Sequence, residues 1–258
     1  MRIGLGLGVG RSRGRIRGTE AETLALVARM SSAPDATRQG HINTLVKSLK
    51  TAGVWSKLDC FYVLAAHDAQ AGLLNWKAAS FDLTAVNAPT FTVDRGYAGN
   101  GSTSYLDSGY NETSALQDDH SLGVWIESGA AGPTTDIGTS MWSIAASDGA
   151  SMSTRSASTS ANPTTATSPL GHTMLSRSVS TGYDRYRNGA ALPAAAQASA
   201  AFTSQNVFLL CRNNGSGAGT IFTNRRQAAA HWGASLTAPE VSALHSSLST
   251  YLQSVGAA

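Results

Sequence analysis

Paired carboxylates would be the clearest sign of catalysis in this chain. A retaining glycoside hydrolase holds a nucleophile and a general acid about 5 Å apart, and alternate positions of one strand place two side chains on the same face. The sequence has no Glu-x-Asp-x-Glu run, and Glu127 is the one glutamate in a predicted sandwich strand. We therefore expect no catalytic residues and a protein that is not an enzyme, with glycoside hydrolysis as the least favoured alternative.

Metal and nucleophile motifs are also weak. Histidine and aspartate are adjacent only at Asp118-Asp119-His120 and at His67-Asp68. A divalent cation needs several converging oxygen ligands, so these residues are interpreted as solvated loop residues, and no metal or other cofactor is predicted. No serine lies in the Gly-x-Ser-x-Gly turn of a nucleophile elbow, which leaves a Ser-His-Asp triad without an anchor.

Aromatic side chains give the best binding hypothesis, because sugar rings stack on flat side chains while amides read the hydroxyl groups. The candidate glycan-binding residues are Trp142, Tyr183, Tyr186, Asn213 and Asn214. Trp142 also lies in an apolar run, so its interpretation as a core residue stays open. The sequence therefore predicts a glycan site at one rim of the fold without fixing its position.

Turn and cap signals place these residues on a β-rich scaffold. Asn188 and Gly189 supply the two positive-φ residues of a type I′ hairpin. A capping box that starts at Thr237 predicts a closing helix over 237–252. Near the start of the chain, a capping box at 19–22 predicts a helix over 20–30, and a second helix is expected to begin after Asp35 and to end before Gly53.

Between these helices the apolar residues follow the period of strands, and turn clusters separate them. This pattern predicts one all-β sandwich, and a chain of 258 residues is a natural length for a single domain of that class. The Ser/Thr-rich stretch 156–168 is expected to form a long loop within the sheet. The predicted strands are 60–65, 80–83, 90–94, 104–107, 122–127, 141–145, 152–155, 173–180, 183–187, 206–211 and 221–223.

The first 18 residues carry the positive charge of the chain. The net charge is +3, and this stretch holds five arginines and no acidic residue, so the remainder is slightly acidic. A broad nucleic-acid surface needs many cations on one face, and none is predicted. Alternating glycines from Gly4 to Gly10 are interpreted as part of an assembly arm, with a disordered terminus as the alternative. The arginines are Arg2, Arg11, Arg13, Arg15 and Arg17.

The same stretch does not have the composition of a secretion signal, because glycine occupies every second position and no cleavage site follows. No apolar run of 18 residues predicts membrane insertion. Cys60 and Cys211 each lie in an apolar run, which favours buried free thiols, and a single long-range disulfide is the alternative. The sequence is thus expected to give a soluble protein made in the cytosol.

Several segments, taken in order, resemble the concanavalin A-like, laminin-G-like jelly rolls found in virion proteins of tailed bacteriophages and related particles. The resemblance covers most of 42–256 and implies a sandwich of two antiparallel sheets with an N-terminal helical lead-in and a short C-terminal helix. It also implies an arm and short helix at 1–33, a laminin-G-like domain at 34–258, and a rim calcium that Asp118 or Asp119 would contact. The segments are "LVKSLKTAGVWSKLDCFYVLAAHDAQAGLLNWK", "FTVDRGYAGNGSTSYLDSGY", "SLGVWIE", "YDRYRNGA" and "AAAHWGASLTAPEVSALHSSLSTYLQSVG".

On this resemblance we expect a non-enzymatic structural virion protein that displays a lectin-like jelly roll for host-surface attachment on a tail, fibre or capsid. The arm would contact other virion proteins, and the chain would form a homo-oligomer, most simply a trimer. The expected location is the virion, after synthesis in the host cytoplasm. The alternative is a freestanding carbohydrate-binding module, in which the arm is a loose end.

Overall fold

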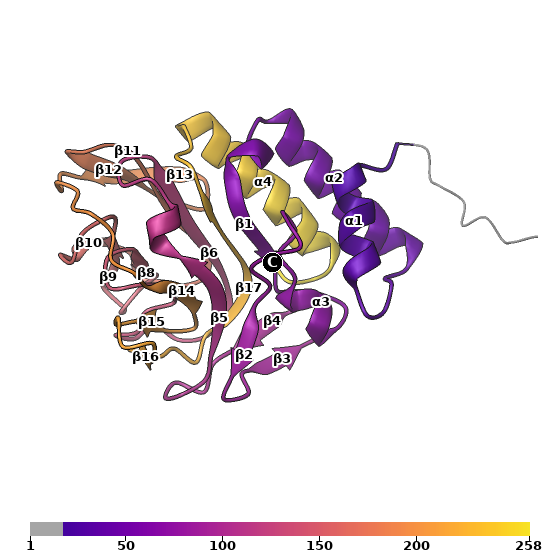
Figure 1. The fold of residues 1–258 in the computed structure, drawn as a ribbon, viewed down its shortest axis with the longest axis horizontal. Helices are drawn as coiled ribbons and strands as arrows, with labels where there is room; N and C mark the ends of the chain where they lie inside the picture. The colour runs from indigo at the N-terminus through magenta and orange to yellow at the C-terminus, as the bar shows by residue number, and fades with distance from the viewer. Residues whose placement is uncertain (1–17) are drawn as a thin grey trace, which may run out of the picture.

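The computed structural model describes residues 18–258, so the predicted arginine arm lies outside the described residues. Two antiparallel sheets pack face to face, and helices cover the outer face of one of them (Figure 1). One core fills the space between the sheets, and a second core lies between the helices and the first sheet. The all-β jelly-roll prediction, with helices at both ends of the chain, is confirmed.

The first sheet has eight strands and forms the middle layer. Its order is β13-β12-β11-β6-β17-β4-β3, and β1 pairs with β17 beside β4. The bounds are β1 (Leu58–Val63), β3 (Thr90–Thr92), β4 (Gly96–Ala98), β6 (His120–Ser128), β11 (Gly171–Val179), β12 (Gly182–Arg187), β13 (Ala190–Ala195) and β17 (Arg226–Gly233).

The second sheet has seven strands in the order β10-β9-β8-β7-β14-β5-β2. A separate small hairpin, β15–β16, packs against β14 and β7. The bounds are β2 (Thr84–Val86), β5 (Tyr105–Asn111), β7 (Ile137–Gly138), β8 (Ser143–Ala145), β9 (Ser151–Arg155), β10 (Asn162–Thr165), β14 (Asn206–Leu209), β15 (Arg212–Asn213) and β16 (Gly219–Thr220).

Strand alternation divides the side chains of the first sheet between the two cores. On β6, Leu122 and Val124 point toward the second sheet, whereas Trp125 points toward the helices. This arrangement follows from the two-residue period of a strand. Because both faces are buried, the strand reads as a nearly continuous buried run and not as an apolar-polar alternation.

Three longer helices cover the first sheet: α1 (Ala21–Arg29), α2 (Ala36–Thr51) and α4 (Ala238–Ser254). Asp35 caps α2 by accepting a hydrogen bond from the Arg38 N–H at 2.7 Å. The Glu240 carboxylate accepts from the Thr237 N–H at 2.8 Å, so both predicted caps are confirmed. The short helices are α3 (Ala69–Leu73), η1 (Trp55–Lys57) and η2 (Glu112–Ser114).

The cap predicted for the first helix is wrong. Its N-cap is Glu20, whose side chain makes no capping hydrogen bond, because the carboxylates of Glu20 and Glu22 instead pair with Lys50 on α2. Leu26 on α1 is 2% exposed and lies in the same core as α2 and α4. The predicted division into 1–33 and 34–258 stays a prediction.

Most of the predicted strands are confirmed, but two are absent and several observed strands were not predicted. Asn188 and Gly189 have φ of +48° and +78°, which confirms the type I′ turn. Segments 80–83 and 221–223 are not strands, since Phe81 and Ile221 have positive φ. The predicted loop 156–168 contains β10, and β17 was not predicted at all.

Both cysteines are free and fully buried, as expected. Burial raises the pKa of each thiol to about 12, so neither is a thiolate near neutral pH. A buried ion pair holds the loop before β7 to the segment before β17: Arg225 Nη1 donates to Asp136 Oδ2 at 2.8 Å. The Nε and Nη2 atoms of Arg225 donate to the carbonyls of Ala130, Gly132 and Ser147.

The interior also holds histidines that must stay neutral. Burial lowers the pKa of His120 to about 4 and that of His231 to about 3. Unfolded histidine titrates near 6.5, so the unfolded chain binds more protons than the folded chain between these values. The stability contribution is therefore present in full above about pH 6.5 and is lost as the pH falls below it.

We predict that the free energy of unfolding falls between about pH 7 and pH 5, with each of these two histidines contributing up to about 1.4 kcal/mol per pH unit. Urea unfolding measured across this range checks the slope. His231→Gln should be less stable at pH 7 but should show a shallower slope than the wild type. An unchanged slope in that variant would show that His231 is not the group responsible.

Candidate functional site

The strongest candidate site is a cavity of about 480 Å³ between α4 and one end of the first sheet. It receives side chains from β6, from the β12–β13 turn and from α4. We call it the α4 cavity. Its lining residues are Trp125, Ile126, Glu127, Leu170, Gly171, Asn188, His245, Ser249, Gln253, Ala257 and Ala258.

Local geometry explains why these residues meet. Trp125 and Glu127 are two positions apart on β6, so they share the face that α4 covers. His245, Ser249 and Gln253 recur every four residues and therefore line one face of α4. The β12–β13 turn is docked against this helix: a Cβ on Gly189 would lie 3.0 Å from the His245 ring.

Aromatic rings form one wall of the α4 cavity. The Trp125 ring is stacked on His245, with centroids 5.4 Å apart, and on His172, 5.8 Å away. His172 lies behind the cavity, with its Nε2 2.8 Å from Nε2 of His231. Burial lowers the pKa of His172 and His245. The wall is thus uncharged near neutral pH.

Glu127 supplies the carboxylate of the cavity. Its Oε2 lies 3.4 Å from Arg226 Nη1, and its Oε1 lies 3.8 Å from Arg95 Nε. These two arginines hold the carboxylate in place at the cavity wall. Among the described residues that line the cavity, no second carboxylate side chain accompanies it. The arrangement can accept hydrogen bonds from hydroxyl groups.

Amide and hydroxyl groups complete the polar part of the lining. The side-chain oxygen of Asn188 accepts a hydrogen bond from the backbone N–H of His172 at 2.8 Å, which fixes the Asn188 side chain at the turn. On α4, Gln253 Nε2 donates to Ser249 Oγ at 3.2 Å. These groups stand beside Trp125 and Glu127, so the cavity combines an aromatic surface with several oriented polar groups.

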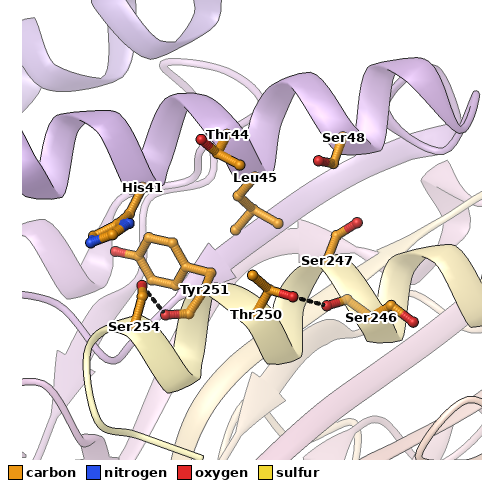
Figure 2. Close-up of a pocket in the computed structure, with 9 residues that line it drawn as sticks. All are labelled: His41, Thr44, Leu45, Ser48, Ser246, Ser247, Thr250, Tyr251 and Ser254. Atoms are coloured by element: carbon orange, nitrogen blue, oxygen red, sulfur yellow. Dashed lines mark hydrogen bonds between the residues drawn. The ribbon is translucent and has the colours of Figure 1, made fainter.

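Two other hollows carry less chemistry. A groove of about 330 Å³ between α2 and α4 is lined by hydroxyl side chains, with His41 and Tyr251 at one end (Figure 2). Two of those hydroxyls are engaged within α4, since Thr250 donates to the Ser246 carbonyl and Ser254 to the Tyr251 carbonyl. A third hollow of about 350 Å³ lies at the β11–β12 turn and contains Asp184.

The structure does not bring the predicted glycan residues together. Trp142 is fully buried and Tyr183 is 4% exposed, both in the core between the sheets. Tyr186 faces the helices. Asn213 is buried and bonds the backbone of Asn206, while Asn214 is exposed in the following loop. Buried rings cannot stack on a sugar, so these three aromatics are core residues in this fold.

The aspartates considered for calcium have protein partners. Asp118 accepts a hydrogen bond from Ser199 Oγ at 2.5 Å, and Asp119 accepts from the Ser235 N–H at 2.8 Å. Within residues 18–258, no three His, Cys, Asp or Glu side chains gather in a way that could hold a metal ion. In the same residues, no helix is long and apolar enough to cross a membrane.

Sequence reasoning missed the α4 cavity as a site. The four-residue spacing of His245, Ser249 and Gln253 was a usable signal, because it puts three polar side chains on one helical face. Trp125 was interpreted as core, and Glu127 was considered without its neighbours. Their meeting with α4 depends on tertiary packing.

No protein-family model and no curated protein matches this sequence. Solved structures do share the fold. A mutant of the Trypanosoma rangeli sialidase with trans-sialidase activity matches with a TM-score of 0.55 and 12% identity, over 84% of this chain and 40% of the sialidase. This chain therefore spans less than half of that protein.

Two further similar structures have TM-scores of 0.49. Domain 4 of a GH43 extracellular arabinanase from Geobacillus stearothermophilus, in complex with arabinotriose, is 17% identical over 73% of this chain and 98% of that domain. The binding domain of botulinum neurotoxin serotype D is 8% identical over 74% of this chain and 52% of that chain.

The comparison with the sialidase contradicts the prediction that this chain is not an enzyme, because the β-sandwich is shared with a protein that is one. The reason for the error is that the prediction rested on carboxylate spacing along single strands. Catalytic groups are also assembled from separate elements, which such spacing does not detect. The likeness to the sialidase shows the β-sandwich fold alone, and none of the three structures is a phage protein.

Proposed function

We propose that the chain binds carbohydrate in the α4 cavity. The observation that carries this proposal is the meeting of the partly buried His245 ring, which is stacked on Trp125, with the Glu127 carboxylate and the amide groups of Asn188 and Gln253. Small-molecule sites combine an aromatic or apolar wall with a few oriented polar groups, in cavities of roughly 300–1,000 Å³. The volume of about 480 Å³ falls in this range.

Each part of the lining has a separate task in this proposal. The partly buried His245 ring, which covers Trp125, contacts the C–H face of a sugar ring. Glu127 accepts hydrogen bonds from sugar hydroxyls, and its two arginine neighbours orient it. The amides of Asn188 and Gln253 both donate and accept, which suits hydroxyl groups that do the same.

A second candidate function is glycoside hydrolysis in the same cavity, with Glu127 as the reacting carboxylate. The fold shared with a sialidase favours it. Two carboxyl groups are the usual requirement for this chemistry, so the second group would come from the substrate or from a carboxylate outside the lining. Glu127 would then take part in bond cleavage in addition to binding.

Two serines of α4 allow a matched binding test. Ser249 lines the α4 cavity and Ser247 lines the α2–α4 groove, and both are partly buried on the same helix. We predict that Ser249→Ala weakens glycan binding about tenfold, or roughly 1.4 kcal/mol, whereas Ser247→Ala leaves it unchanged. A glycan array identifies the ligand, and calorimetry measures both variants. Equal affinities in the two variants would place the binding site elsewhere.

Hydrolysis has its own prediction. If the second candidate is correct, the purified protein releases reducing sugar from a bound polysaccharide, and Glu127→Gln reduces kcat at least about a hundredfold because the amide cannot replace a reacting carboxylate. The Ser249→Ala variant should raise KM more than it lowers kcat. Activity that survives Glu127→Gln would remove this residue from the chemistry, and no sugar release from any bound glycan would remove the second candidate.

We also propose that the sandwich is displayed on a phage or phage-like particle, where its glycan binding serves host attachment. The support is the sequence resemblance to phage jelly rolls and the arginine-rich arm at 1–18. In this proposal the arm contacts other virion proteins and the particle carries the chain as a homo-oligomer, most simply a trimer. A freestanding lectin-like module is the alternative.

Deletion of the arm distinguishes display on a particle from a freestanding module. We predict that a variant lacking residues 1–18 folds and binds glycan like the full chain but no longer joins the particle. Circular dichroism and glycan binding check the fold, and immunoblotting of purified particles measures incorporation. Full incorporation of the truncated protein would show that the arm is not the attachment element.

A further inference from the structure

Two arginines on the outer face of the second sheet stand apart from the α4 cavity. Arg155 ends β9, and Arg212 begins β15. Both are partly buried. Arg225 has a carboxylate partner, and Arg177 donates to several backbone carbonyls. In the described part of the chain, Arg155 and Arg212 have neither a carboxylate partner nor more than one carbonyl acceptor.

Strand register places Arg155 in a row across the second sheet. Ser143 pairs with Arg155 on one side and with Gly138 on the other, and Gly138 in turn pairs with Phe208. Ile144, the residue after Ser143 on β8, points into the core between the sheets. Ser143 and the rest of this row therefore face outward.

The β15–β16 hairpin lies over this row. It lies beside β14 (Figure 1) and contacts both β14 and β7, and Asn213 Nδ2 donates to the Asn206 carbonyl at 3.0 Å. Arg212 is the first residue of this hairpin and therefore lies on the same outer face as Arg155. In agreement with this placement, burial first and the charge of Arg212 second lower the pKa of Arg155.

Neither guanidinium is neutralised. Among residues 18–258, no carboxylate forms an ion pair with Arg155 or Arg212. Arg155 donates from Nε to the Thr159 carbonyl at 3.1 Å and from Nη1 to Ser143 Oγ at 3.4 Å. Arg212 Nε is buried without a hydrogen-bond partner. By contrast, Arg177 donates to carbonyls of four residues.

We propose that Arg155 and Arg212 bind an oxyanion, the carboxylate or sulfate group of an acidic saccharide, on the outer face of the second sheet. Guanidinium groups bind such oxygens through two parallel N–H donors. A bound anion would satisfy the buried Nε of Arg212 and cancel the repulsion between two like charges. The Ser143 hydroxyl lies beside Arg155 and offers a further donor. This site is separate from the α4 cavity and does not depend on it.

The test is a titration of the ¹⁵N-labelled full chain with sodium sulfate, with sodium chloride adjusted to keep the ionic strength constant. We expect saturable shifts of the Arg155 and Arg212 Nε–H resonances. Arg212→Gln should weaken sulfate binding at least about tenfold, as read from the Arg155 resonance. Lys47→Gln changes the charge equally at an exposed residue of α2 and should leave the affinity unchanged.

Further titrations identify the source of the anion. Acetate and glucuronate compete with sulfate if a carboxylate is accepted, and glucose should not compete. Binding of sulfate but not of glucuronate would overturn the carboxylate part of the proposal. Shifts that do not saturate, or that are equal in Arg212→Gln and Lys47→Gln, would overturn the site itself.

A charge-conserving variant distinguishes loss of the binding geometry from loss of the fold. Arg155→Lys keeps the positive charge but loses the planar pair of donors, so it should fold and still bind sulfate several times more weakly than the wild type. Sulfate affinity should be the same in Ser249→Ala as in the wild type. Failure of the α4 cavity to bind glycan would therefore leave the sulfate result intact, and the reverse also holds.

Discussion

The burial of β17 on both faces is the constraint on which the rest of the structure depends. This strand pairs with β6 along one side and with β1 and β4 along the other, so it joins most of the first sheet. Helices cover one of its faces and the second sheet covers the other. Ala228, Ala229 and Ala230 are fully buried, and their small side chains allow both layers to approach the strand closely.

That close approach also determines where the candidate cavity lies. His231 on β17 fits over Gly123 of β6, where a Cβ would lie 2.2 Å from its Nε2. Its ring contacts His172, which stacks on Trp125 beneath α4. The aromatic wall of the cavity is thus supported by the central strand pair. Because this support consists of buried neutral rings, the same packing that builds the wall makes the protein sensitive to acid.

Local signals in the sequence were sufficient for the β12–β13 turn and for two of the three predicted helix caps. Asn188-Gly189 and the caps at Asp35 and Thr237 act within a few residues, so tertiary context did not override them. The segment "RQAAAHWG" was missed because alanine is depleted in strands and its selection here reflects packing on two faces. The cavity was missed for the same kind of reason, since Trp125, Asn188 and Gln253 are distant in sequence and meet only through the sheet and α4.

The fold alone does not choose between binding and catalysis, because one scaffold hosts unrelated functions and the site carries the chemistry. In the α4 cavity, Glu127 is balanced by Arg95 and Arg226. A glycoside hydrolase needs two carboxyl groups in different roles, and Glu127 is the one carboxylate side chain among the described residues that line this cavity. The lining therefore suits a hydrogen-bond acceptor for sugar hydroxyls, and a proton donor for a leaving group has to come from another residue.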